Sequence, residues 1–252
     1  MTSNALLDLL TKLSGPKMRS LTRPQLASTE STYLATQTAV IDSASDKHAK
    51  SKLLWSGKNR DRFRAIRAVL ESISGASLRC MYCDDSAATD IDHFDPRART
   101  PELTFVWDNY LLACSGCNSN AKRDKFPTDP TGSPLLVNPM EEDPFETLAL
   151  NPANGRLLTE SEKGLRTIEV FDLNRKRLTT SRIDAWVALD ALIRAYDAAR
   201  TANRETRAES TLSTLHEYAF AEVLATMRAY ARSANDLLSE DLRDIFAARP
   251  EL

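Results

Sequence analysis

All four cysteines of the chain fall into two pairs of identical spacing, Cys80-Met-Tyr-Cys83 and Cys114-Ser-Gly-Cys117, separated by 30 residues. Two C-x-x-C pairs are typical of a tetrahedral zinc site, because each pair presents two thiolates to one ion. Disulfides would need an oxidising compartment, of which the sequence gives no sign, and a redox-active C-x-x-C would not need a second copy. We therefore predict one structural zinc ion bound by Cys80, Cys83, Cys114 and Cys117.

Three other polar residues stand close to these cysteines in the chain. Asp92 and His93 begin nine residues after Cys83, and Asn118 directly follows Cys117. If both cysteine pairs bind one zinc ion, these three side chains come together. A carboxylate, an amide and an imidazole suit an oxygen-ligated divalent ion with a general base beside it. Phosphodiester hydrolysis needs this set, since neutral imidazole accepts a proton from water while a cation neutralises the charge that grows on the phosphate.

This part of the sequence resembles the HNH, or His-Me finger, endonucleases with a four-cysteine zinc frame. The resemblance covers about residues 78–126, roughly a fifth of the chain. It rests on four motifs: Cys80-x-x-Cys83, Asp92-His93-Phe94-x-Pro96, Trp107-x-Asn109-x-Leu111, and Cys114-x-x-Cys117-Asn118 followed by Lys122.

The resemblance implies an α+β fold in which zinc holds a β-hairpin and a following helix. It also implies four candidate catalytic residues. His93 would be the general base, Asp92 and Asn118 would bind a catalytic Mg²⁺-like ion, and Asn109 would hold the loop that carries His93.

Two positions depart from the family pattern. Asn118 stands where many members have histidine, which favours Mg²⁺ or Mn²⁺ over zinc at the catalytic site. Lys122 stands where some members place another histidine ligand. Because a protonated lysine cannot bind a metal, we predict instead that Lys122, with Arg123 beside it, contacts a phosphate of the nucleic acid.

Further short motifs extend through about residue 182: Met18-Arg19-x-x-x-Arg23-Pro24, Phe105-x-Trp107-x-Asn109, Lys125-Phe126-Pro127, Asn138-Pro139, Gly155-Arg156-Leu157, Thr167-Ile168 and Leu173-Asn174. With these motifs the chain resembles the HNH subunit of Septu-type anti-phage systems, including those attached to retrons. This resemblance implies an effector nuclease that acts on nucleic acid, with DNA as the expected substrate, and an ABC-type ATPase as partner. We expect residues 175–247 or the N-terminal arm to supply the docking surface.

Composition excludes several other classes of protein. Of 252 residues, 42% are hydrophobic and 27% charged, which is typical of a globular domain. No apolar run of 18 residues exists to span a membrane, and Gly and Pro form no repeat. The leucines of Met1–Leu13 have no basic stretch before them and no small-residue cleavage site after them. We therefore expect no signal peptide and a cytoplasmic location.

The net charge of −2 gives no reason by itself to expect a polyanionic ligand, but the charge is unevenly distributed. Residues 47–126 contain 14 Lys and Arg against 10 Asp and Glu, whereas the remainder contains 19 against 25. The middle of the chain is therefore the more plausible place for an anionic ligand. Its densest basic cluster, which we interpret as a solvated helix face, is Lys58, Arg60, Arg62, Arg64 and Arg67.

Hydrophobic periodicity and turn residues predict four parts. These are an irregular or partly helical arm (1–59), the HNH core (60–126), a mixed extension with short strands (127–174) and a helical C-terminal region (175–252). The predicted helices are 60–72, 117–122, a stripe from Ile183 to Tyr196, a stripe from Leu212 to Tyr230, and 236–247. The predicted strands are 89–93, 110–113, 135–137, 147–150 and 156–159, the last two around an Asn154-Gly155 turn.

One alternative from another class remains, a zinc ribbon that binds nucleic acid or protein without cutting it. Such a module needs the cysteines but has no use for Asp92 and His93, so the pair favours the nuclease. The two other histidines, His48 and His216, stand alone in the sequence. We interpret them as surface or packing residues.

Overall fold

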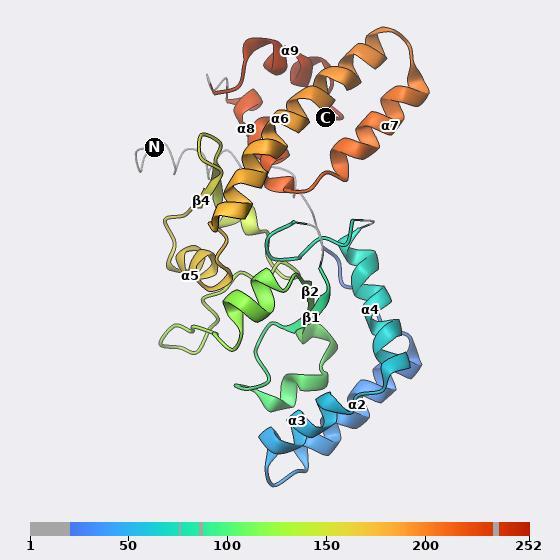
Figure 1. Ribbon diagram of the computed structural model, residues 1–252, viewed down its shortest axis with the longest axis vertical. Coiled ribbons are helices and arrows are strands. Elements are labelled where there is room, and N and C mark those ends of the chain that lie inside the picture. Colours follow the sequence, from blue (N-terminus) through green and yellow to red (C-terminus); the bar gives the residue numbers. More distant parts are fainter. Residues whose placement is uncertain (1–20, 76, 86–87, 234–236) are drawn as a thin grey trace. The chain divides into compact units, whose positions relative to one another are not determined.

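The computed structural model describes residues 21–75, 77–85, 88–233 and 237–252 (Figure 1). The expectations for Met1–Leu13, Met18 and Arg19 lie outside these residues. The described chain forms two compact units, one of residues 21–141 with 169–172 and the other of 142–168 with 173–252. Helices and two small antiparallel sheets confirm the α+β class. No helix in the described ranges is long and apolar enough to cross a membrane.

Three helices precede the cysteines in the first unit: α2 (Ser28–Asp42), α3 (Lys47–Ser56) and α4 (Arg60–Ser74). The expected arm is thus helical over much of its described length. Side chains cap two of these helices, since Asp46 accepts from the amide of Ala49 at 2.9 Å and Asn59 accepts from the amides of the first turn of α4. Such caps satisfy amide groups that the first helical turn leaves unbonded.

The predicted amphipathic helix of residues 60–72 is confirmed as α4. Its apolar residues Phe63, Ile66 and Leu70 are buried, and α4 packs against strand β2 (Tyr110–Ala113; Figure 1). An aromatic cluster forms around Phe63, whose ring centroid lies 5.1 Å from that of Trp55 and 6.2 Å from that of Phe105. Helix α3 is therefore joined to the core through aromatic packing.

The hairpin predicted between the cysteine pairs is also confirmed. Strand β1 (Asp90–His93) pairs antiparallel with β2, with Asp92 opposite Leu111 and His93 opposite Tyr110. The helix expected after the second cysteine pair is a π-helical segment, Gly116–Lys122. The segment 135–137 is not a strand: Thr128 and Pro134 form only an isolated bridge, because the prolines around it remove the amide donors that a ladder needs.

In the second unit a two-stranded hairpin, β3 (Ala149–Asn151) and β4 (Arg156–Leu158), turns at the predicted Asn154-Gly155 pair. Gly155 has a φ of 67°, and a Cβ there would lie 2.0 Å from the carbonyl oxygen of Thr179. Both features require glycine at this position.

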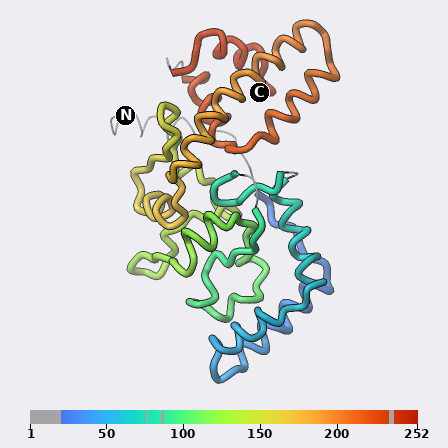
Figure 2. Tube along the Cα trace, viewed as in Figure 1, coloured from blue at the N-terminus to red at the C-terminus, as the bar shows by residue number. Residues whose placement is uncertain are grey.

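Five helices complete the described chain: α5 (Glu162–Phe171), α6 (Lys176–Thr201), α7 (Glu205–His216), α8 (Ala221–Arg232) and α9 (Glu240–Ala248). Figure 2 shows α6 and α7 running side by side, and the two helices pack extensively. The single stripe expected from Leu212 to Tyr230 is wrong, because the chain breaks between α7 and α8, where Phe220 adopts a left-handed φ of 61°. Helix α5 was not expected.

Candidate metal centre and nuclease site

The four cysteines converge in the first unit. Their sulfur atoms all lie within 4.8 Å of one another, all four side chains are buried, and none forms a disulfide. The Sγ atoms of Cys83 and Cys114 are 3.9 Å apart. A tetrahedral ion with Zn–S bonds of about 2.3 Å would hold sulfurs roughly 3.8 Å apart, so the cluster fits zinc.

His93 lies at the end of β1 with its ring orientation determined by a hydrogen bond. Its Nε2 is 2.9 Å from the backbone oxygen of Thr104, which also accepts from the hydroxyl of Tyr110 at 2.7 Å. A carbonyl oxygen only accepts, so Nε2 must carry the proton. Burial lowers the pKa of His93 to about 4, so the imidazole is neutral near pH 7. The lone pair of a neutral ring protonated on Nε2 resides on Nδ1, which can accept a proton.

Two aromatic rings support this imidazole. The ring centroid of Trp55 lies 4.5 Å from that of His93, and the ring of Tyr110 lies 5.3 Å away, nearly perpendicular. Trp55 belongs to α3, far from the cysteines in sequence. Our sequence interpretation missed it, because only the fold brings the arm to His93.

Asn109 makes several hydrogen bonds to the loop that follows His93. Its Oδ1 accepts from the amide of Asp95 at 2.8 Å, and its Nδ2 donates to the backbone oxygens of Asp95 at 2.9 Å and Leu103 at 3.1 Å. Its own backbone oxygen accepts from the amide of Phe94 at 2.8 Å. Asn109 thus connects both ends of the loop that follows His93.

Asp92 is buried and engaged on both oxygens. Lys122 Nζ lies 3.0 Å from Oδ1 and 2.9 Å from Oδ2, and the hydroxyl of Tyr82 donates to Oδ2 at 2.5 Å. Lys122 also donates to the backbone oxygen of His93 and has no exposed side-chain surface. Burial raises the pKa of Asp92, while the ammonium of Lys122 acts in the opposite direction.

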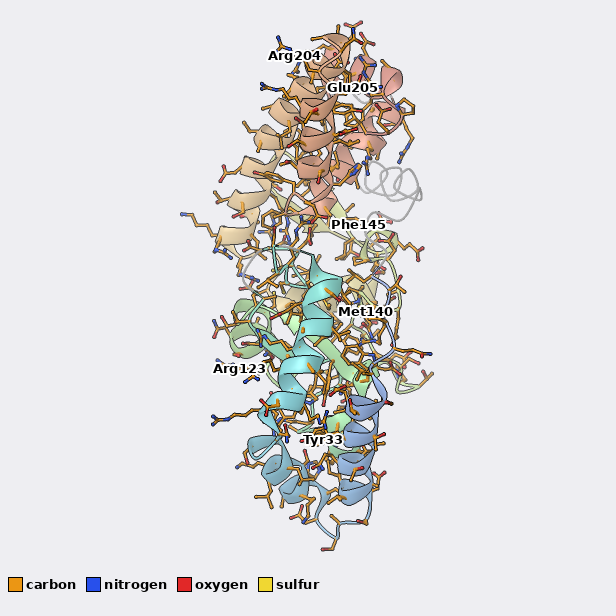
Figure 3. The ribbon with its side chains drawn as sticks, turned by 90° about the vertical axis from the view of Figure 1, so that its right-hand side faces the viewer. Tyr33, Arg123, Met140, Phe145, Arg204 and Glu205 are labelled. Atoms are coloured by element: carbon orange, nitrogen blue, oxygen red, sulfur yellow. The ribbon has the colours of Figure 1, made fainter. Side chains whose placement is uncertain are left out.

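The position of Lys122 bears on the phosphate contacts that the sequence predicts for Lys122 and Arg123. The ammonium of Lys122 faces inward and pairs with Asp92, so the structure does not place it at the surface where a phosphate contact was expected. Its neighbour Arg123 is exposed and projects outward (Figure 3).

The two predicted ligands of a catalytic divalent ion, Asp92 and Asn118, are not arranged to bind such an ion. A divalent ion at Asp92 would lie against the ammonium of Lys122, and like charges at such a distance repel. The side-chain nitrogen of Asn118 donates to Asp90 at 3.2 Å. Within the described ranges, only the four cysteines form a group of three or more His, Cys, Asp or Glu side chains close enough to share a metal ion. Asp92 and Asn118 therefore do not fit a divalent ion while Lys122 holds the carboxylate.

Most of the predicted site residues line a cleft of about 790 Å³. It is lined by Asp92, His93, Asn118 and Arg123, whereas Asn109 and Lys122 are not among its lining residues. His48, which we interpreted as a surface or packing residue, is exposed and also lines the cleft. The remaining lining residues are Ser51, Lys52, Trp55, Ile91, Pro96, Arg97, Ala98 and Asp124.

Comparison with known proteins agrees with this geometry. Residues 80–124 match the family model described as HNH endonuclease. These residues contain both cysteine pairs, the β1–β2 hairpin and the site residues from Asp92 to Lys122. The HNH endonuclease match therefore covers the four-cysteine centre and the hairpin that carries His93.

The chain is also similar to two curated proteins, both called Septu protein PtuB. It is 29% identical to the protein of Bacillus mycoides (strain KBAB4) over 134 residues, covering 41% of this chain and 45% of that protein. It is 26% identical to the protein of Bacillus thuringiensis over 102 residues, covering 38% of this chain and 37% of that protein. The chain thus spans less than half the length of these relatives. No solved structure matches it.

Proposed function

We propose that this protein is an endonuclease that hydrolyses phosphodiester bonds of DNA, with His93 as the general base, and that it is the effector nuclease of an anti-phage system. One observation carries the assignment. His93 is held by the Thr104 carbonyl as the neutral tautomer with its lone pair on Nδ1, at the wall of a cleft with Lys52, Arg97 and Arg123.

The chain's own residues account for the proton transfer. Nδ1 of His93 takes a proton from a water molecule as that water's oxygen attacks phosphorus. The bond from phosphorus to the leaving sugar oxygen breaks, and that oxygen takes a proton from solvent. The Thr104 carbonyl stabilises the positive imidazolium that forms. Arg97 and Arg123 attract the phosphate, and Trp55 and Tyr110 hold the imidazole ring.

Dependence on Mg²⁺ or Mn²⁺ is a separate part of the proposal and follows from the family resemblance. It requires Lys122 to release Asp92, since the carboxylate is otherwise neutralised. The test compares cleavage by zinc-loaded protein in EDTA with cleavage after Mg²⁺ or Mn²⁺ is added. Activity only with an added ion supports metal dependence, whereas full activity in EDTA with zinc retained contradicts it.

An ABC-type ATPase partner is also part of the proposal. The similarity to Septu proteins supports it, and so does the net charge of −2, since non-specific affinity for a polyanion comes from basic residues that displace counterions. We place the docking surface in residues 175–247 or the N-terminal arm, and the protein in the cytoplasm, where thiols stay reduced. Co-expression with a candidate ABC-type ATPase, followed by size-exclusion chromatography, should show co-elution. A chain that never co-elutes and digests DNA fully by itself contradicts this.

The direct test of the nuclease is a cleavage assay on plasmid DNA, single-stranded DNA and RNA, with the wild type and His93→Ala compared at equal zinc content. We expect DNA cleavage by the wild type and not by His93→Ala. An inactive wild type with every metal ion and with its partner would instead support a zinc-ribbon binding module.

A further inference from the structure

The cleft beside His93 has a continuation along α4. A second hollow of about 670 Å³ shares Trp55, Ile91 and Asn118 with the first. Its other lining residues come mainly from the end of α3 and from α4: Ser56, Lys58, Arg60, Phe63, Arg64, Arg67, Asp90 and Ser119. The two hollows therefore share a wall, with α3 lining both and α4 lining the second.

Basic residues predominate in this combined lining. Seven are Lys or Arg: Lys52, Lys58, Arg60, Arg64, Arg67, Arg97 and Arg123. Three are acidic, Asp90, Asp92 and Asp124. Asp92 is neutralised by Lys122, which lies behind the lining. The surface around His93 is thus positive although the chain as a whole is slightly negative.

Most of these cations have no acidic partner within the described ranges. In the part of the chain that the structure describes, Lys52, Arg60, Arg97 and Arg123 form no ion pair. Arg64 pairs with Asp61 at 2.9 Å, but both side chains are more than three-quarters exposed, and such a pair contributes little. Arg67 differs, because Glu71 and the backbone oxygen of Thr89 hold it, and we leave it out.

The ammonium of Lys58 lies near two aromatic rings and is repelled by two neighbouring arginines. Its ammonium lies 4.5 Å from the ring centroid of Trp55 and 5.6 Å from that of Phe63. Burial lowers the pKa of Lys58, and repulsion from Arg97 and Arg60 lowers it further. Like charges that face a cleft without acidic partners are stabilised when an anion enters it.

We infer that Lys52, Lys58, Arg60, Arg64, Arg97 and Arg123, here called the cationic cleft, bind the phosphate backbone of the DNA substrate and that α3 and α4 guide the strand to His93. This inference rests on the proposed function. Several cations spread along one surface suit repeated phosphates better than a single small anion, which would engage only two or three of them.

The test uses the full chain with His93→Ala, which keeps the DNA intact during binding. In this background, Arg60→Gln with Arg64→Gln removes two exposed charges of the cationic cleft. Arg204→Gln with Arg207→Gln is the matched control, because these arginines of the second unit are also exposed. Fluorescence anisotropy with a labelled DNA duplex and an RNA of the same sequence, from 50 to 200 mM KCl, gives affinity and its salt dependence.

We expect the Arg60/Arg64 variant to bind DNA about tenfold more weakly at 100 mM salt, with the slope of log affinity against log salt reduced by about 2. The control should bind as the parent does. Equal affinity and slope in the Arg60/Arg64 variant would overturn the cationic cleft while cleavage by the wild type left the nuclease intact. Tighter binding of RNA than of DNA would overturn the choice of ligand. A wild type that cuts no nucleic acid would instead refute the proposed function.

Discussion

The Nζ atom of Lys122 lies 2.9 Å from Oδ2 of Asp92, and both side chains are buried. Lys122 also donates to the backbone oxygen of His93, so one ammonium group holds two adjacent residues at the end of β1. It approaches them from the segment that follows the second cysteine pair. Lys122 therefore connects the segment that follows the second cysteine pair to the strand that carries His93.

Removal of this ammonium should destabilise the protein strongly. We predict that Lys122→Met lowers the free energy of unfolding by about 3–5 kcal/mol, because it leaves the Asp92 carboxylate buried without a partner. The double variant Asp92→Asn/Lys122→Met should recover part of this loss, since no buried charge remains. Urea denaturation at equal zinc content measures both changes. A single variant within 1 kcal/mol of wild type would show that the pair is not a buried charge pair.

Asn109 should act on the reaction through the loop that follows His93. We predict that Asn109→Ala lowers kcat more than it raises KM and lowers the free energy of unfolding by about 2 kcal/mol, because the backbone groups of Asp95 and Leu103 lose their partners. Zinc content should be unchanged. Asn120→Ala is the control, since this exposed asparagine lies in the same domain. Similar kinetics for the two variants would argue against the positioning role.

Trp55 should keep the imidazole in place. We predict that Trp55→Ala lowers kcat at least about tenfold, because the ring 4.5 Å from His93 is lost and the base gains freedom to move. Trp55→Phe should restore much of the rate, since it retains an aromatic surface. Steady-state kinetics on one DNA substrate, with zinc content measured in parallel, provides the comparison. A kcat of Trp55→Ala equal to that of wild type would exclude this role.

Zinc should be needed for folding of the HNH domain. We predict about one zinc ion per chain by elemental analysis and loss of the domain's structure when a strong chelator removes it, because four buried thiolates repel one another without a cation. Cys80→Ser should reproduce this loss. Folded, soluble protein that contains no zinc after purification under reducing conditions without chelators would refute the prediction.

Local spacing was enough to predict the parts of the site that are close in sequence. The two cysteine pairs, the β1–β2 hairpin and the amphipathic α4 each have a short-range pattern, and each is present. The placement of Trp55 had no such signal. A tryptophan in a polar helix does not reveal which strand the helix will pack against.

Lys122 shows a different limit of sequence reasoning. Because a protonated lysine cannot bind a metal ion, the sequence predicts that Lys122 contacts a phosphate. Its inward direction is set by the π-helical segment Gly116–Lys122 and by the buried partner Asp92. Neither the helix type nor the pairing follows from residue spacing. The break between α7 and α8 at Phe220 was missed for a similar reason, because the apolar stripe continues across it.

The most direct test of the central claim is cleavage of a labelled DNA duplex by the wild type and by His93→Ala, each verified to be folded and to contain equal zinc. The proposed ATPase partner and Mg²⁺ or Mn²⁺ are present in both reactions. We predict that the substitution reduces the cleavage rate by about 10²–10⁴-fold while DNA binding is retained, because it removes the group that takes the proton from water. A His93→Ala variant that cleaves at the wild-type rate would contradict the assignment of His93 as the general base.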